Sequence, residues 1–189
     1  MFLVNKLLNE LAELDGLTGL SNRRTLNIHL DRIWKQAIRD NHEVAIAMID
    51  VDHFKKYNDR YGHLQGDAAL RAVADVIAHH ARRPLDITAR YGGEEFAVVW
   101  YHPSATELPR MAEIMTKAVV ALNMPHAGSE IGSLSISVGV ALMKPCKGEG
   151  SEDLLRLADA ALYDAKRQGR NRVVVKQPSD IVAQVGGGI

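Results

Sequence analysis

The stretch YGGEEFAVVW, residues 91–100, joins a turn, two adjacent carboxylates and an apolar run. Two glycines before an apolar run are typical of a turn, and the run at 96–100 is typical of a buried strand. The turn therefore places Glu94 and Glu95 at the end of a rigid element. Clustered carboxylates repel one another unless a positive charge lies between them, and Mg²⁺ prefers oxygen ligands and usually arrives with phosphates. The alternative, from this turn alone, is a solvated hairpin with spare acidic side chains.

A second acidic cluster follows another apolar run. Residues 44–49 (VAIAMI) have the composition of a central strand buried on both faces, and Asp50, Val51 and Asp52 come directly after them. Because side chains alternate along a strand, Asp50 and Asp52 should point to the same side. If this strand pairs with the run after the glycines, Asp50 converges with the two glutamates at one edge of the sheet. Two acidic strand ends that meet in this way are typical of two-metal phosphoryl or nucleotidyl transfer.

Apolar periodicity and turn signals divide the rest of the chain into helices and strands. The expected elements are a helix capped by Ser21 or Asn22 that runs to about 39, a strand at 44–49, a helix at 54–60, a helix that opens at 66, a hairpin of 86–90 with 95–100, a helix at 104–123, a strand at 133–142, a helix from 151 to near 169, and a strand at 172–175. From the first strand onward the order is β-α-α-β-β-α-β-α-β. This order predicts an α+β fold in which a mixed sheet is covered by helices.

Composition excludes several function classes. The chain has 189 residues, enough for one domain with a core, and its 23 Lys and Arg residues balance its 23 Asp and Glu residues. Without a net field we expect no nucleic-acid partner and no membrane contact by this chain. The single Cys146 rules out an internal disulfide and fits a reducing compartment. No apolar stretch approaches the ~18 residues of a membrane span, and the N-terminus does not resemble a signal peptide. We therefore expect a cytoplasmic module, whether or not the full protein is anchored in a membrane.

Motifs spread over most of the chain, in a fixed order, carry a family resemblance. They are DGLTGL at 15–20, NRR at 22–24, DVDHFK at 50–55, ND at 58–59, YGH at 61–63, GD at 66–67, GGEEF at 92–96, SISVGV at 135–140, AD at 158–159, ALY at 161–163, AK at 165–166 and GRN at 169–171. In these motifs the chain resembles the GGDEF family of diguanylate cyclases, in the GGEEF variant, over about residues 15–175. The resemblance implies the palm-like fold shared with nucleotidyl cyclases and polymerase palms. It also implies condensation of two GTP molecules into cyclic di-GMP, with release of two pyrophosphates.

The resemblance further implies a metal site at the two acidic strand ends. The expected ligands of Mg²⁺ or Mn²⁺, with two ions per active site, are Asp50, the backbone carbonyl of Val51, Glu94 and Glu95. The family pattern favours Glu94 as the group that also accepts the proton of a ribose 3′-hydroxyl. Lys55 would neutralise charge on the transferring phosphorus; without the motif it resembles any exposed lysine. Asp52 is expected to support the turn rather than bind metal. His53 replaces the aromatic residue that is commoner in the family and receives no catalytic role.

Nucleotide contacts are also implied by the resemblance, since no G-x-x-x-x-G-K-[ST] phosphate loop is present. Asn58 and Asp67 would read guanine, because adenine would leave their polar groups unpaired. His63 would contact the ribose or position the loop, although an isolated histidine is more often a packing residue. Lys166 and Arg170 are spaced i, i+4, so they are expected to share a helical face and to bind the triphosphate. A helix C-terminus attracts cations in any case.

Catalysis is expected to need a homodimer. Each domain holds one GTP, and the 3′-hydroxyl of one must attack the α-phosphorus of the other, so two domains must face each other. Residues 1–14 would be the end of a signalling helix from an upstream sensor domain; the alternative is a local helix that folds back. The cyclase domain is expected at 15–177, followed by a disordered or vector-derived tail at 178–189.

A product site is expected upstream of the glycines. Arg83 and Asp86 match the R-x-x-D inhibitory site of the family in spacing and in offset from Gly92. Arg can pair with phosphate or guanine, and Asp can accept from guanine. Cyclic di-GMP is therefore expected to inhibit by binding there, with assistance from Arg82 and Arg90. The alternative is a surface Arg–Asp pair.

Three other functions remain beside an active cyclase. The chain could be a non-catalytic receptor for GTP or cyclic di-GMP, which is less favoured because the acids and bases of the motif are all present. It could be an output module that requires a missing sensor. An adenylate cyclase or polymerase-like activity is more distant, and a comparison of ATP with GTP would decide it.

Overall fold

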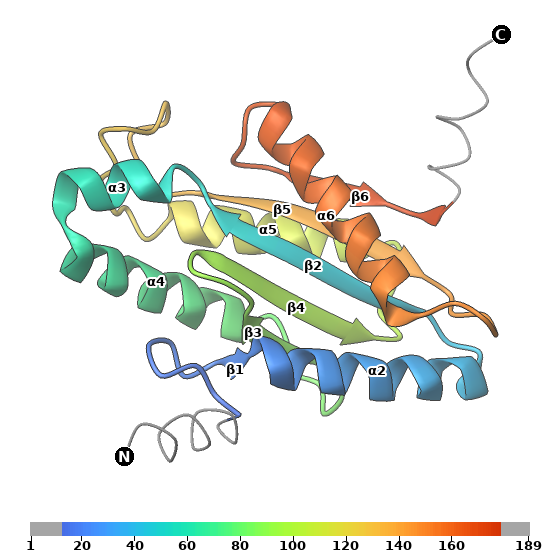
Figure 1. The fold of residues 1–189 in the computed structure, drawn as a ribbon. Coiled ribbons are helices and arrows are strands. Elements are labelled where there is room, and N and C mark those ends of the chain that lie inside the picture. Colours follow the sequence, from blue (N-terminus) through green and yellow to red (C-terminus); the bar gives the residue numbers. More distant parts are fainter. Residues whose placement is uncertain (1–12, 179–189) are drawn as a thin grey trace, which may run out of the picture.

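The computed structural model describes residues 13–178, which form a six-stranded mixed sheet with helices on both faces (Figure 1). The strands lie side by side in the order β1-β3-β4-β2-β5-β6. The elements are β1 (Ser21–Asn22), α2 (Arg23–Asp40), β2 (Val44–Val51), α3 (Phe54–Tyr61), α4 (His63–Ala78), β3 (Ile87–Arg90), β4 (Glu95–Tyr101), α5 (Leu108–Val120), β5 (Ile136–Met143), α6 (Ser151–Arg167) and β6 (Val173–Lys176).

Strand β2 lies in the middle of the sheet. It runs antiparallel to β4 on one side and to β5 on the other, and each of its residues is buried. This is the environment that its continuous apolar run predicts. The sheet is mixed because β1 pairs with β3, and β5 with β6, in parallel. The pairing of β2 with β4, on which the convergence of the acidic strand ends depends, is confirmed.

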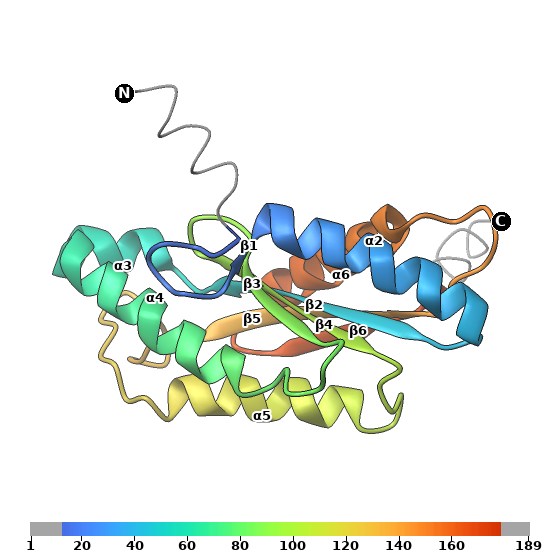
Figure 2. The same cartoon turned by 90° about the horizontal axis from the view of Figure 1, so that it is seen from below.

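Two helical layers cover the sheet, with α2 and α6 on one face and α4 and α5 on the other (Figure 2). The alternation of side chains along β2 serves both layers. Even-numbered residues from Val44 to Met48 pack in the core under α2 and α6, and odd-numbered residues from Ala45 to Val51 pack in the core under α4 and α5. Asp50 continues the even-numbered series and therefore faces α6.

Helix α6 approaches β5 closely at Gly139. A Cβ atom at Gly139 would lie 2.0 Å from the backbone nitrogen of Leu162, so any side chain there would push the helix away. Gly139 is the register partner of Met48, which lies two residues before Asp50 on β2. Lys166 lies about one helical turn beyond Leu162. The close packing at Gly139 therefore brings Lys166 over the acidic end of β2.

The element order from β2 to β6 agrees with the order that the sequence predicts. The two-residue β1 is not predicted, because so short a pair carries no periodic signal. Helix α4 begins at His63, earlier than expected, and α5 is shorter than the expected 104–123. Such shifts of helix ends are common, because periodicity marks the middle of a helix better than its termini.

No helix among residues 13–178 is long and apolar enough to cross a membrane. The expected signalling helix at 1–14 lies outside the described residues except for its last two positions, and Leu14 forms a β-bridge with Ser21 instead of a helical turn. The expected tail also lies outside the described residues, apart from Pro178.

Candidate active site at the acidic strand ends

The two acidic strand ends lie side by side. Asp50 on β2 is the register partner of Glu95 on β4 and, on its other side, of Ser137 on β5. The backbone N–H of Val51 donates to the carbonyl oxygen of Glu94 at 3.2 Å. Pairing of β2 with β4 thus brings Asp50 and Val51 beside Glu95 and Glu94, the four positions expected to bind metal.

The turn between β3 and β4 depends on a glycine. The N–H groups of Tyr91 and Gly92 both donate to the carbonyl oxygen of Glu95, at 2.7 and 3.1 Å. A Cβ atom at Gly92 would lie 2.5 Å from the Oε2 atom of Glu95. A side chain at this position would therefore move the Glu95 carboxylate, so glycine leaves the space that this carboxylate occupies.

Negative charge is concentrated at this end of the sheet. Burial raises the pKa of Asp50, and the neighbouring charges of Glu95 and Asp52 act in the same direction, against the lowering effect of Lys166. Burial also raises the pKa of Glu94, followed by the charge of Asp50. The ammonium of Lys166 lies 2.7 Å from Asp50 Oδ2 and supplies positive charge. Within residues 13–178, no three or more acidic, histidine or cysteine side chains are grouped closely enough to hold a metal ion as they stand.

Asp52 is in a different situation from Asp50, although they are only two residues apart. Its side chain is buried, and its carboxylate accepts from the hydroxyls of Ser135 and Ser137 at 2.7 and 2.6 Å. It also accepts from the backbone N–H of Asn171 at 3.1 Å. Asp52 therefore ties the end of β2 to β5 and to the turn after α6, which agrees with the supporting role expected for it.

Helices α3 and α4 bring Asn58 and Asp67 to the same end of the domain. Asn58 packs against α4 where a glycine makes room for it, since a Cβ atom at Gly66 would lie 1.8 Å from Asn58 Oδ1. That oxygen is buried and has no hydrogen-bond partner among residues 13–178. Asp67 follows Gly66 directly and is half-buried, and His63, the first residue of α4, is exposed. Asn58 thus offers a buried acceptor that a ligand could satisfy.

Lys55 is exposed on α3, which begins directly after His53. His53 has a left-handed backbone with φ of 54°, and its carbonyl oxygen lies 3.2 Å from Nε2 of His126. Burial lowers the pKa of His53, and the positive charge of Arg170 lowers it further. The turn that precedes Lys55 is therefore held by a histidine contact that the sequence does not reveal.

The prediction that Lys166 and Arg170 share a helical face is wrong. Helix α6 ends at Arg167, and Gly169, Arg170 and Asn171 have positive φ values of 114°, 61° and 46°. The left-handed backbone turns the chain away from the helical path. Lys166 contacts Asp50, whereas Arg170 borders, with His53 and residues 129–131, a cavity of about 50 Å³.

The expected product-binding pair lies at the other end of the β3–β4 hairpin. Asp86 accepts from the backbone N–H groups of Tyr101 and Arg83, at 3.2 and 3.3 Å. The exposed Arg83 donates its guanidinium to the carbonyl oxygen of His102 at 3.3 Å. The side chains of Arg83 and Asp86 therefore do not form an ion pair with each other, which was the alternative to a role in product binding. Arg90 does not lie beside them as expected, because it contacts Asp15 and Gly93 at the glycine end.

Known proteins share both the sequence and the fold. The sequence model for the GGDEF domain of diguanylate cyclases matches residues 12–172. Response regulator PleD of Caulobacter vibrioides is 40% identical over 168 residues, which cover 88% of this chain and 37% of PleD. Diguanylate cyclase VdcA of Vibrio cholerae is 38% identical over 166 residues, which cover 86% of this chain and 47% of VdcA. The chain therefore spans less than half the length of these two relatives.

A solved structure has the same arrangement of sheet and helices. The GGDEF domain of DgcB from Caulobacter crescentus, in complex with c-di-GMP, matches with a TM-score of 0.79 at 38% sequence identity, over 86% of this chain and 92% of that one. The α+β fold expected from the element order is thus confirmed, and the family match covers most of the chain. The chain belongs to the GGDEF domain family of diguanylate cyclases.

Proposed function

We propose that this chain is the catalytic domain of a diguanylate cyclase, which condenses two GTP molecules into cyclic di-GMP and releases two pyrophosphates. The observation that carries the proposal is the register of Asp50 on β2 with Glu95 on β4, which brings the two acidic strand ends together. The chain that shows this arrangement is a member of the GGDEF family. The relative VdcA is named a diguanylate cyclase, and the DgcB domain binds c-di-GMP. Both names support the proposed substrate and product.

A divalent cation fits the acidic strand ends. Carboxylate and carbonyl oxygens are the ligands that Mg²⁺ and Mn²⁺ prefer. Burial raises the pKa values of Asp50 and Glu94, neighbouring acids raise them further, and bound positive charge would relieve the repulsion among these acids. The proposed ligands of the two ions are Asp50, the Val51 carbonyl, Glu94 and Glu95. When bound, the ions supply charge neutralisation for the reacting phosphates. Their binding would free the ammonium of Lys166 from Asp50 for contact with the triphosphate.

Guanine recognition is assigned to Asn58 on α3 and Asp67 on α4. Asn58 Oδ1 is buried, has no hydrogen-bond partner in the part of the chain that the structure describes, and would accept from the base. The Asp67 carboxylate would accept from the N1–H and N2–H₂ groups of guanine. Adenine lacks this donor pattern and would leave both side chains unpaired, which disfavours ATP. His63, which is exposed at the start of α4, would contact the ribose or position the loop.

The reaction step needs a proton acceptor near the attacking hydroxyl. The ribose 3′-oxygen of one GTP forms a bond to the α-phosphorus of the other, and the bond from that phosphorus to pyrophosphate breaks. Glu94 would accept the hydroxyl proton as the general base. Lys55, Lys166 and Arg170 would balance the charge on the phosphates and on the leaving pyrophosphate.

Two domains are required, because each holds one GTP and cannot present both reacting groups. Bringing two loaded domains together in a homodimer supplies the proximity that the reaction needs. An upstream sensor domain in the full protein would control this association.

Cyclic di-GMP would inhibit the reaction by binding the exposed Arg83 and the neighbouring Asp86. The Asp86 carboxylate retains further lone pairs beside its two backbone contacts.

The decisive experiment is chromatographic detection of cyclic di-GMP after the purified chain is incubated with GTP and Mg²⁺ over a range of protein concentrations. A rate that rises faster than linearly with protein concentration is expected for a cyclase that must dimerise. Absence of product from a forced dimer that binds GTP tightly would contradict the proposal and favour a receptor. Equal turnover of ATP would contradict the assignment of Asn58 and Asp67.

A further inference from the structure

The loop between Leu14 and Ser21 is closed on itself by backbone contacts. Leu14 and Ser21 form an antiparallel bridge, and the N–H of Asp15 donates to the carbonyl oxygen of Leu20 at 2.7 Å. The Asp15 carboxylate accepts from the backbone N–H and the hydroxyl of Thr18, at 2.9 and 2.7 Å. The loop is therefore a compact unit that presents an acidic side chain at a defined position.

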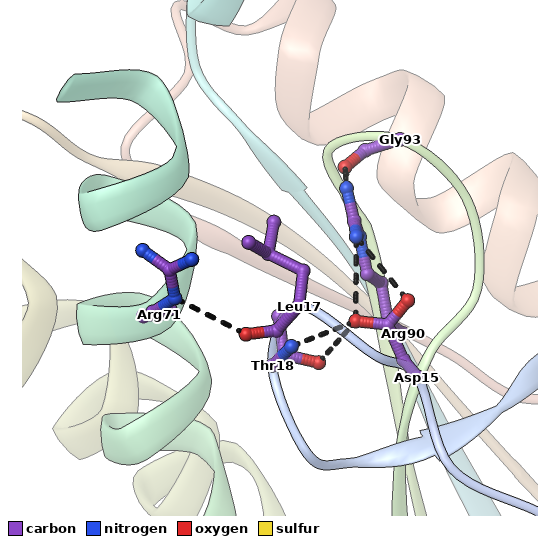
Figure 3. Close-up of polar contacts among 6 residues, drawn as sticks. All are labelled: Asp15, Leu17, Thr18, Arg71, Arg90 and Gly93. Atoms are coloured by element: carbon purple, nitrogen blue, oxygen red, sulfur yellow. Dashed lines mark hydrogen bonds and ion pairs between the residues drawn. The ribbon is translucent and has the colours of Figure 1, made fainter. Parts of the chain in front are cut away.

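Arg90 joins this loop to the signature turn (Figure 3). Its Nη1 atom donates to both carboxylate oxygens of Asp15, at 3.3 and 3.2 Å. Its Nε and Nη2 atoms donate to the carbonyl oxygen of Gly93, at 3.1 and 2.7 Å. Only 18% of the Arg90 side chain is exposed. The planar guanidinium can hold both partners at once, which a lysine ammonium on a flexible chain cannot do with the same geometry.

Burial by itself would raise the pKa of Asp15, but hydrogen bonds from Thr18 and the charge of Arg90 lower it overall. The carboxylate is therefore ionised at neutral pH. The Gly93 carbonyl that Arg90 holds belongs to the peptide group that leads into Glu94. Any movement of Arg90 would consequently be passed to the two glutamates of the turn.

The same loop is also tied to helix α4. Arg71 Nε donates to the carbonyl oxygen of Leu17 at 3.3 Å (Figure 3). Arg71 lies four residues after Asp67, so both side chains lie on the same face of α4. The loop is thus fastened on one side to the turn that carries Glu94 and on the other to the helix that carries Asp67.

We propose that Asp15 and Arg90 are positioning residues, which together with Arg71 and the loop at 14–21 form a bracket between the metal-binding turn and the guanine-binding helix. The proposal rests on the proposed function. The bracket fixes the spacing between the glutamates and the base-reading residues, so that the α-phosphate and the carboxylates meet in a productive arrangement. It touches neither substrate nor metal and acts through the Gly93 peptide.

The test uses the Arg90→Lys and Asp15→Asn variants, because both substitutions retain the approximate size of the side chain. The matched control is Arg156→Lys, which alters an Arg–Asp pair between Arg156 and Asp153 on the exposed surface of α6. Rates of cyclic di-GMP formation are measured against GTP concentration, at a protein concentration that saturates the rate. Hydrogen exchange of the backbone amides at 91–95 is measured in the same variants without nucleotide.

Misplacement of reacting groups by a fraction of an ångström to an ångström costs large factors in rate. We therefore expect each bracket variant to lower kcat by about tenfold or more and to change KM for GTP by less than about twofold, with amides 91–95 exchanging faster. The control should leave all three quantities unchanged. A merely structural pair would lower the melting temperature while the folded variants kept the wild-type kcat, and that result would overturn the proposal.

The two readouts separate failure of the bracket from failure of the proposed function. If the wild-type chain forms no cyclic di-GMP even as a forced dimer that binds GTP tightly, the proposed function fails, and exchange at 91–95 still reports whether Asp15 restrains the turn. If the wild type is active and both variants keep its kcat and its exchange pattern, the bracket is rejected. If Arg90→Lys does not fold, Asp15→Asn carries the test alone.

Discussion

The two ends of the β3–β4 hairpin hold buried or half-buried carboxylates that have different partners. At the far end, Asp86 accepts two backbone N–H groups and so closes the turn that it belongs to. At the glycine end, Asp50 and Glu94 face one another and other acids, and Lys166 is in contact with Asp50. Burial raises the pKa of Asp86 as well, but its two backbone hydrogen bonds offset part of this effect, whereas the crowded carboxylates at the glycine end also repel one another. The excess negative charge is therefore where we expect a cation and chemistry.

Removal of a crowded carboxylate should have the largest effect on turnover. For Asp50→Ala or Glu94→Ala we expect the rate of cyclic di-GMP formation to fall by about 10²-fold or more, as for loss of one charge-stabilising group in other active sites. The exposed acid of α5, changed in Glu113→Ala, is the control and should leave the rate unaltered. Residual activity within about tenfold of the wild type in either variant would remove that residue from the site.

Removal of the Asp52 carboxylate, which lies at the same end of β2 as Asp50 and has its hydrogen bonds satisfied, should affect stability instead of turnover. Asp52→Ala leaves the hydroxyls of Ser135 and Ser137 and the N–H of Asn171 without their acceptor. We expect the free energy of unfolding to fall by about 3–5 kcal/mol, measured by urea denaturation. Asp52→Asn keeps one carbonyl oxygen and should cost less. A loss below about 1 kcal/mol for the alanine variant would show that these donors find other partners.

Substitution at the far end of the hairpin should alter regulation and leave catalysis intact. Arg83→Ala removes an exposed guanidinium, so we expect initial rates and stability to stay close to wild type. The concentration of cyclic di-GMP that halves the rate should rise by about tenfold, as for loss of a charged contact to phosphate or guanine. An inhibition curve that coincides with that of the wild type would exclude Arg83 from product binding.

The smallest effect concerns the pH dependence of stability. The pKa values of Asp50 and Glu94 are raised above their usual 3.8 and 4.5, mainly by burial, so the folded domain binds their protons more tightly than the unfolded chain does. Stability contributed by these groups therefore increases as pH falls from neutral through the raised pKa values. Unfolding of the metal-free domain at several pH values should show this rise, and Glu94→Gln should reduce it. A slope that is identical in wild type and variant would assign the effect to other groups.

The local sequence determined much of the acidic end. Apolar runs of the right length identified β2 and β4, and the two-residue period placed Asp50 and Asp52 on one face. The two glycines before Glu94 located the turn, and a Cβ atom at Gly92 would lie 2.5 Å from the Oε2 atom of Glu95. These features follow from neighbouring residues alone, because strand alternation and turn geometry are short-range properties.

Contacts between distant segments were decided only by the tertiary structure. Lys166 reaches Asp50 because α6 packs closely on Gly139 of β5, and Arg170 leaves the helical face because the chain turns left-handed after Arg167. Arg90 meets Asp15, 75 residues earlier, through the parallel pairing of β1 with β3. Sequence spacing identifies which residues share a helix or strand, but it does not determine which partner a long charged side chain will find. That choice depends on how the sheet and its two helical layers bring separate segments together.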